Sequence, residues 1–339
     1  MSRDVFIIGA GFSVGLGYPL LRNLLEYVWS DISKKDRKMI AKVIKFHNPN
    51  FEPNHPFTYP DIETLLTQFE ANIELFKHTR PVEGNFKKAD IIKARDTLLI
   101  EMSKKFHKTN ETVSIDKYKW LEIFKSRLLS NNSTVISFNY DLVFEKILFN
   151  NELSPKTYGF RPGDEEIKIL KPHGSLNWFR QNEDTGRLKQ EKIQKLLKTD
   201  DVAMFNLPRH PKSKMGKTCT PHLIPPTFTK KFAGDVYETT LKNSVAALSK
   251  AKNVIFLGCS LPKSDFHSQF MIRCGLHNQI EGEILPKGER TKPVGPANII
   301  VVNPDEGAAR NTMNLVSKKH KFIWKKMTVK KWFKEEIAP

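Results

Sequence analysis

The sequence predicts an α/β protein in which a parallel sheet carries helices on both faces. Short apolar runs of the length of buried strands recur along the chain, and segments with helical periodicity lie between them. Such alternation is typical of a parallel sheet, because each return to the same edge of the sheet needs a crossover. The expected strands are 4–8, 134–138, 167–170, 254–257, 299–302 and 322–324.

Helical patterns occupy most of the remaining chain. The expected helices are 35–46, 61–78, 141–149, 236–250, 265–276 and 306–317, with further helical periodicity over 91–106 and 120–128 and a closing helix capped by Thr328. We expect a core built from residues 1–30, 131–180 and 231–339. A helical insertion (31–130) and a loop-rich insertion (181–230) interrupt it.

Composition indicates a folded protein of a reducing compartment. The 339 residues include 39% hydrophobic residues and 23 Phe, which exceeds what a disordered chain carries. No apolar run reaches the roughly 18 residues of a membrane-spanning helix, and the N-terminal apolar stretch runs straight into a glycine turn. Three scattered cysteines suit neither a disulfide framework nor a four-thiolate zinc site. We therefore expect a cytoplasmic protein without a membrane segment.

The formal charge of +18 raises the question of nucleic-acid binding. The surplus is concentrated in residues 201–339, which hold 23 Lys and Arg against 11 Asp and Glu. The densest stretch, 318–334, also reads as a strand and a helix, whose lysines would ordinarily face solvent. The charge could equally attract an anionic dinucleotide or an acidic partner protein, so nucleic-acid binding stays open.

A glycine turn follows the first expected strand, in the order Gly9-Ala10-Gly11-Phe12-Ser13. Glycines let the backbone approach a pyrophosphate closely, and the helix that follows offers unpaired N–H groups. This context predicts a Rossmann-like core that binds a dinucleotide, although a tight turn without a ligand is the alternative. A second strand ending in Asp or Glu would be expected of a dehydrogenase; the chain enters the helix 35–46 instead.

Polar residues follow two further expected strands. Asn139 and Asp141 come after 134–138, and His173 comes after 167–170. Taken singly, Asn139 reads as a turn residue, Asp141 as a helix cap and His173 as a loop histidine. Ligands of open α/β sheets bind at the carboxyl ends of the strands, and His can take up a proton near neutral pH. Their shared location therefore favours a common functional site.

The ordered blocks resemble sirtuin-like proteins. Gly-Ala-Gly-x-Ser, Asn-x-Asp and His-Gly are followed by Gly258-Cys259-Ser260 and by Asn303. The stretches 171–178 (KPHGSLNW) and 138–141 (FNYD) are similar to the bacterial sirtuin-like NADases of anti-phage defence systems. The resemblance spans residues 5 to about 303, with motif identity confined to these blocks.

The resemblance implies a role for each matching residue. Asn139 would orient the nicotinamide ribose or the attacking water, and Asp141 would hold the nicotinamide carboxamide. His173 would act on a ribose hydroxyl as general base. The other implied NAD contacts are Gly9, Ala10, Gly11 and Ser13 at the pyrophosphate, Gly258 and Ser260 at a phosphate, Asn303 at the adenosine ribose, and Arg22.

Departures from the deacylating sirtuins change the expected reaction. No Cys-x-x-Cys is present, so we expect no zinc module and no metal. The segment 17–22 (GYPLLR) keeps Arg22 but lacks the Asp and Phe of Gly-Ile-Pro-Asp-Phe-Arg, and Phe138 replaces a Gln. The resemblance therefore implies hydrolysis of NAD to ADP-ribose and nicotinamide, by the toxic effector of a defence system.

Two other functions stay open. One is an NAD-dependent protein deacylase or ADP-ribosyl transferase. The other is a non-catalytic subunit that senses NAD or ADP-ribose and binds nucleic acid or a partner. Because unrestrained NAD cleavage would harm the cell, we expect control by a separate regulatory protein or by homo-oligomer assembly.

The cysteine distribution yields a direct prediction about metal. With no cysteine pairs to supply thiolate ligands, the purified protein should hold no stoichiometric zinc, and a chelator should leave its melting temperature unchanged. Elemental analysis of the protein measures this, and about one zinc per chain would contradict it.

Overall fold

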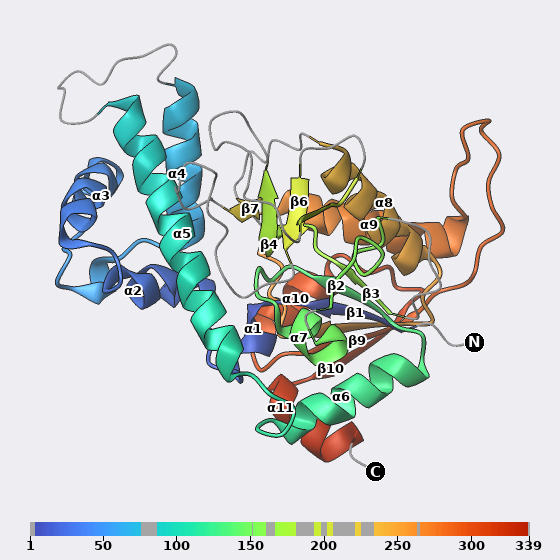
Figure 1. The fold of residues 1–339 in the computed structure, drawn as a ribbon. Coiled ribbons are helices and arrows are strands. Elements are labelled where there is room, and N and C mark those ends of the chain that lie inside the picture. The colour runs from blue at the N-terminus through green and yellow to red at the C-terminus, as the bar shows by residue number, and fades with distance from the viewer. Residues whose placement is uncertain are drawn as a thin grey trace.

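A six-stranded parallel sheet forms the core of the protein in a computed structural model (Figure 1). The structure describes residues 4–75, 87–150, 152–160, 167–180, 193–197, 202–205, 221–224, 234–262 and 265–337. The sheet strands are β1 (Asp4–Ile8), β2 (Thr134–Ser137), β3 (Lys168–Leu170), β8 (Asn253–Leu257), β9 (Asn298–Val302) and β10 (Lys321–Lys325). All six strands expected from the sequence are present, and every neighbouring pair in the sheet is parallel.

The strand order is β10-β9-β8-β1-β2-β3. The chain first adds β2 and β3 on one side of β1 and later adds β8, β9 and β10 on the other side. This is the 3-2-1-4-5-6 order of a Rossmann-like sheet, in which the direction of the connections reverses beside the first strand. The predicted fold class is confirmed. The crevice for a ligand is therefore expected at the carboxyl ends of β1 and β8.

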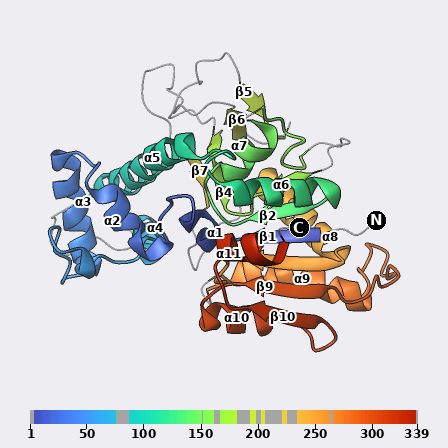
Figure 2. The ribbon, with the colours of Figure 1, turned by 90° about the horizontal axis from the view of Figure 1, so that it is seen from below.

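Helices cover both faces of this sheet because the strands are apolar on both sides; all five residues of β1 are buried. One face packs against α1 (Ala10–Val14), α6 (Lys119–Ser130), α7 (Val143–Phe149) and α11 (Val329–Trp332). The other face packs against α8 (Asp235–Ser249), α9 (Phe266–Glu281) and α10 (Glu306–Met313). Seen from below, α6 and α11 lie in front of the sheet (Figure 2).

An aromatic cluster holds the short helix α1 in place. The Phe12 ring lies 5.1 Å from Phe144 of α7 and 5.5 Å from Phe124 of α6. Phe124 in turn contacts Phe6 of β1 at 5.1 Å and Phe333, near the C-terminus, at 4.9 Å. Buried aromatic pairs of this kind add packing energy and a defined geometry, so α1 is anchored against both α6 and α7.

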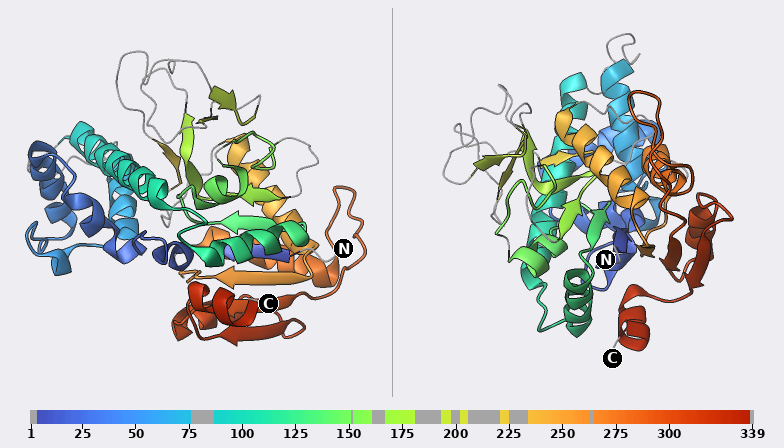
Figure 3. Two further views of the ribbon diagram at one scale, coloured as in Figure 1. Left: turned by 60° about the horizontal axis from the view of Figure 1, so that its bottom comes forward. Right: turned by 90° about the vertical axis from the view of Figure 1, so that its right-hand side faces the viewer.

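A helical block projects from one end of the sheet (Figure 3). It contains α2 (Leu24–Trp29), α3 (Lys34–His47), α4 (Ile62–Leu75) and α5 (Lys88–Thr112). Residues 76–78 of the expected helix 61–78 lie outside the described residues. Although α6 falls within the predicted insertion 31–130, it packs on the parallel sheet, because its apolar side meets Phe6 and Phe12.

A second, antiparallel sheet follows His173. It consists of β4 (Gly174–Arg180), β5 (Ile193–Lys195), β6 (Val202–Phe205) and β7 (Pro221–Leu223), in the order β5-β6-β4-β7. Three of these strands lie in 181–230, which we expected to be loop-rich. Strands of three or four residues are too short to show a period of two, so the sequence pattern missed them.

The ends of two core helices also differ from the prediction. Helix α9 runs to Glu281 and ends at Gly282, whose φ of 79° stops the helical path. Helix α10 ends at Met313 rather than near 317. The Thr328 cap is confirmed, since its side chain accepts the Lys331 N–H. Within the described ranges, no helix is both long and apolar enough to cross a membrane.

Candidate functional site

A cavity opens where β1, β2, β3 and β8 end, the position expected from the strand order. Seven of the residues proposed from the sequence line this cavity: Gly9, Ala10, Ser13, Asn139, Asp141, His173 and Ser260. They come from four separate segments of the chain. The parallel register explains their meeting, because it brings the carboxyl ends of neighbouring strands to one edge.

The floor of the site is a direct backbone contact between two glycine turns. Gly11 N–H donates to the Gly258 carbonyl at 2.9 Å. A Cβ on Gly258 would lie 2.3 Å from the Phe12 nitrogen, and one on Gly9 would lie 2.5 Å from Cys259 Cα. Gly258 also has a φ of 60°, which disfavours any side chain. These positions therefore need glycine for packing, whether or not a phosphate binds.

This contact corrects one expectation. We expected the N–H groups after β1 to be unpaired and available to a pyrophosphate, but Gly9 N–H donates to Leu257 O at 3.1 Å and Gly11 N–H is taken by Gly258. Helix α1 has only five residues, so its dipole is small as well. The N–H groups of Gly9 and Gly11, which we expected to be free, are therefore bonded to the backbone of β8 and of the turn that follows it.

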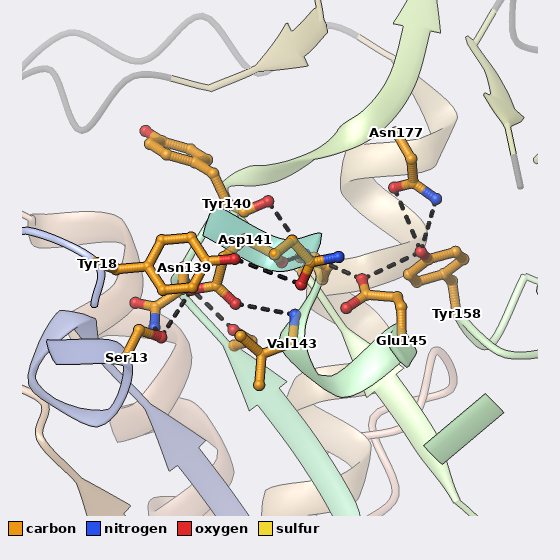
Figure 4. A network of polar contacts seen from close by, with 12 residues as sticks. Ser13, Tyr18, Asn139, Tyr140, Asp141, Val143, Glu145, Tyr158 and Asn177 are labelled. Atoms are coloured by element: carbon orange, nitrogen blue, oxygen red, sulfur yellow. Dashed lines mark hydrogen bonds and ion pairs between the residues drawn. The ribbon is translucent and has the colours of Figure 1, made fainter. Parts of the chain in front are cut away.

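Ser13 connects Asn139 to Asp141 (Figure 4). The Asn139 amide Nδ2 donates to Ser13 Oγ and to the Gly9 carbonyl, both at 3.0 Å. Ser13 Oγ in turn donates to Asp141 Oδ2 at 2.7 Å. Both amide hydrogens of Asn139 are therefore bonded to Gly9 and Ser13, which follow β1. The Oδ1 atom is the remaining polar atom of the side chain that can bond to a ligand.

Asp141 also has a local structural role. Its Oδ1 accepts the Val143 N–H at 3.2 Å at the start of α7, as a helix cap does. The side chain is only 3% exposed. Each carboxylate oxygen can accept a second hydrogen bond, so Asp141 can anchor α7 and Ser13 while presenting negative charge to the cavity.

His173 faces a carboxylate that the sequence analysis did not name. Its Nε2 lies 3.2 Å from Asp265 Oδ2 and 3.2 Å from Ser268 Oγ. Asp265 caps α9 by accepting the Ser268 N–H. The Phe138 ring packs 5.0 Å from the imidazole. The ring is thus oriented by an acidic partner on one side and held by an aromatic on the other, an arrangement suited to proton transfer.

The cavity is acidic although the chain is strongly basic. Glu63, Asp141 and Asp265 line it, and none of its described lining residues is Lys or Arg. Glu63 comes from α4, so the helical block supplies part of the wall. Burial raises the pKa of Tyr18 and of Tyr140 well above the usual value, so both lining phenols stay neutral. Such a cavity favours a positively charged group over a phosphate.

Four proposed residues lie outside the cavity lining. Gly11 and Gly258 face each other in the backbone contact described above. Arg22 lies in the short helical turn η1 (Leu21–Asn23) and is exposed. Asn303 bridges two loops: its Nδ2 donates to Cys259 O at 3.1 Å and its Oδ1 accepts Asp305 N–H at 2.9 Å.

Cys259 lines the cavity but is unsuited to nucleophilic chemistry. Burial raises the pKa of its thiol to about 12, whereas a reactive cysteine needs a lowered pKa. Among the described residues, no three His, Cys, Asp or Glu side chains are grouped as metal ligands would be.

Asp265 and Glu63 are site residues that were not predicted from the sequence. Asp265 carried one usable signal, since it was expected to begin a helix just after the Gly258–Ser260 turn. Glu63 carried none, because it is one of several acidic residues in an amphipathic helix. Only the folded chain places that helix beside the cavity.

Part of the chain is similar to a known family of domains. Residues 133–274 match the family model of the SIR2-like domain, and this range includes Asn139, Asp141, His173 and Ser260. A sirtuin structure described as "The Structural basis of Sirtuin Substrate Affinity" is 11% identical over 98% of this chain and 91% of that chain, with a TM-score of 0.39. A structure of SIR2 with the inhibitor EX-527, 2'-O-acetyl-ADP-ribose and a deacetylated p53 peptide is 11% identical over 98% of this chain and 90% of that chain, with a TM-score of 0.38. No curated protein matches the sequence.

The glycine contact can be tested by adding one methyl group. Gly258→Ala should lower the free energy of unfolding by about 2–5 kcal/mol, from left-handed strain and from the clash with Phe12. Gly288→Ala is the matched control, because Gly288 also has a positive φ of 82° but an added methyl group would meet no atom within 4 Å. Urea unfolding should show a loss of only about 1 kcal/mol for the control. If both variants lost the same free energy of unfolding, the contact between the two turns would contribute nothing to stability.

Proposed function

We propose that the chain binds NAD at the carboxyl ends of β1, β2, β3 and β8 and hydrolyses it to ADP-ribose and nicotinamide. The proposal rests on one observation. Asn139 and His173 line the same acidic cavity, which lies where the direction of the strand connections reverses. The match of residues 133–274 to the SIR2-like domain supports the choice of NAD as ligand.

The cavity's charge suggests how NAD lies in it. The nicotinamide ring of NAD is cationic and its pyrophosphate is anionic. Carboxylates of Glu63, Asp141 and Asp265 favour the cationic end inside the cavity. The pyrophosphate then extends toward the rim, where Ser260 is exposed and lines the mouth. In this proposed pose, the bond between nicotinamide and ribose would lie beside Asn139.

The reaction needs little covalent help from the protein. The bond between the ribose C1′ and the nicotinamide nitrogen breaks, and nicotinamide leaves as a neutral molecule with the electron pair. The oxocarbenium-like ribose is then stabilised by the carboxylates of the cavity. Water adds to C1′, and the overall products are ADP-ribose, nicotinamide and one proton.

Asn139 and His173 supply positioning and proton transfer. Because both Nδ2 hydrogens of Asn139 are bonded, its Oδ1 is held ready to accept a hydrogen bond from the attacking water or a ribose hydroxyl. His173 accepts the released proton, directly or through a ribose hydroxyl. Asp265 stabilises the imidazolium that forms, as the carboxylate of a catalytic triad does.

The alternatives differ in what receives the ADP-ribosyl group. A deacylase or ADP-ribosyl transferase needs a second substrate at the cavity, and a sensing subunit needs no reaction at all. The His173–Asp265 pair favours catalysis over sensing, because binding alone requires no oriented base.

We further propose that the protein acts in the cytoplasm as the toxic effector of an anti-phage defence system, and that its activity depends on assembly with a regulatory protein or with further copies of itself. The basic surface of residues 201–339 would meet an acidic partner or nucleic acid. Both the helical block and the second sheet border the parts of the chain that form the cavity, so contacts on either could shift the alignment of its residues.

Nicotinamide release from NAD tests the reaction. Asn139→Ala and His173→Ala should each lower kcat by about 100-fold or more, because positioning and general base catalysis typically supply this much. Chromatography of the products gives the rate, and thermal melting reports whether the fold persists. His277→Ala is the control, since this histidine is exposed on α9 and should leave the rate unchanged.

Two outcomes would contradict the hydrolase. Wild-type turnover in both cavity variants would show that the reaction occurs elsewhere. NAD binding by calorimetry with no nicotinamide released, even at enzyme in excess over NAD, would favour the sensing subunit.

Co-expression tests the proposed control. The chain expressed alone should deplete cellular NAD more slowly than the chain expressed with its genomic neighbour, and the two samples should differ in particle size. Equal depletion by the isolated monomer would rule out control by assembly.

A further inference from the structure

A buried lysine donates hydrogen bonds to the backbone of two residues that line the cavity. Lys171 follows β3, and its side chain is 1% exposed. Its Nζ lies 2.5 Å from the Asp141 carbonyl, 3.0 Å from Glu145 Oε1 and 3.4 Å from the Tyr140 carbonyl. An ammonium has three donors, so all of them have partners within this one small region.

The buried ion pair alone does not account for this lysine. Removing two charges from water costs about as much free energy as their attraction returns, and well-packed apolar residues often replace such pairs without loss. Burial raises the pKa of Glu145, with Lys171 opposing that effect, as expected of a strongly desolvated pair. Simple attachment of α7 to β3 could therefore be achieved with apolar side chains.

Apolar side chains in place of Lys171 could not donate hydrogen bonds to the carbonyls of Tyr140 and Asp141. After β2 the chain leaves the sheet, so these carbonyls have no partner in the parallel ladder and need buried donors. Leu176 N–H donates to the Tyr140 carbonyl at 3.2 Å, and Lys171 donates to the carbonyls of both Tyr140 and Asp141. The backbone that presents Asn139 is thereby fixed from below.

A chain of polar groups holds Glu145, the carboxylate that pairs with Lys171, and Figure 4 shows its members Glu145, Tyr158 and Asn177. Tyr158 Oη donates to Glu145 Oε1 at 3.1 Å, and Asn177 Nδ2 donates to Tyr158 Oη at 3.0 Å. Asn177 lies in β4, which follows His173 directly. The lysine thus joins the segment after β2, which carries Asn139, to the segment after β3, which carries His173.

We propose that Lys171 is a positioning residue of the NAD-cleaving site, which sets the Asn139–Asp141 backbone relative to His173 through the carbonyls of Tyr140 and Asp141. The inference rests on the proposed function for its consequence in catalysis. Its structural part, the order of the segment after β2, is independent of any reaction.

The test removes the lysine without leaving a lone buried charge. Lys171→Met combined with Glu145→Leu replaces the ion pair by apolar groups of similar size. The fold should persist with a lowered melting temperature, because the Asp141 carbonyl loses its buried donor. The kcat for nicotinamide release should fall about 100-fold, because a displacement near 1 Å is enough for such a loss. KM should change much less, since the binding groups remain. Lys171→Met with Glu145→Gln is the second variant if the first does not fold.

Lys146→Met is the matched control. Lys146 also donates to two backbone carbonyls, of Asn110 at 2.7 Å and of Glu111 at 3.0 Å, but these lie at the end of α5 and not beneath Asn139. Its loss should leave kcat within about twofold of wild type. If Lys146→Met lowered kcat as much as the double variant does, the loss of any hydrogen bond that holds α7 would slow the reaction. This result would overturn the inference.

Hydrogen exchange separates this inference from the proposed function. Peptides covering residues 138–143 should exchange about tenfold faster in the double variant without NAD, because the segment opens more readily. If wild type releases no nicotinamide, the proposed function fails, while the exchange result still tests positioning. Unchanged exchange, or wild-type kcat in the folded double variant, would overturn the role of Lys171.

Discussion

The close approach of two glycine turns, at the ends of β1 and β8, is the constraint on which the rest of the site depends. Gly11 donates to the Gly258 carbonyl, and neither turn has room for a methyl group at the contact. Because these strands are neighbours where the connections reverse direction, their loops diverge above the contact and leave a crevice. The same contact orients α1, so that Ser13 points toward Asn139 and Asp141.

Above this floor, the site separates two kinds of charge. The cavity is lined by carboxyl groups of Glu63, Asp141 and Asp265, whereas the buried cation Lys171 does not line it and bonds to the backbone carbonyls of Tyr140 and Asp141. Among the residues that the structure describes, no Lys or Arg lines the cavity, although the whole chain has a formal charge of +18. An acidic interior in a basic protein is consistent with capture of an anionic dinucleotide whose reacting end is cationic.

Local patterns were enough to locate the sheet and much of the site. Each core strand contains a short apolar run, and in the central strands β1, β2 and β8 both faces are buried, so no periodicity was needed to recognise them. Residues placed immediately after such strands, Asn139 and His173 among them, lie in the cavity because parallel strands end at one edge. Three strands of the second sheet, β5 to β7, escaped detection because they have only three or four residues each and show no alternating pattern.

The sequence by itself determined the strands, their helices and the polar residues at the strand ends, since all of these follow from runs of neighbouring residues. Only the tertiary structure decided which of those groups remain available. It placed Ser13 on Asp141, 128 residues away, took up the Gly11 N–H with Gly258, and turned Asn303 inward to bridge two loops. It also brought Asp265 to His173 and Glu63 to the cavity wall. Such contacts join segments that are distant in the chain, and their formation depends on how helices and turns pack rather than on any local pattern.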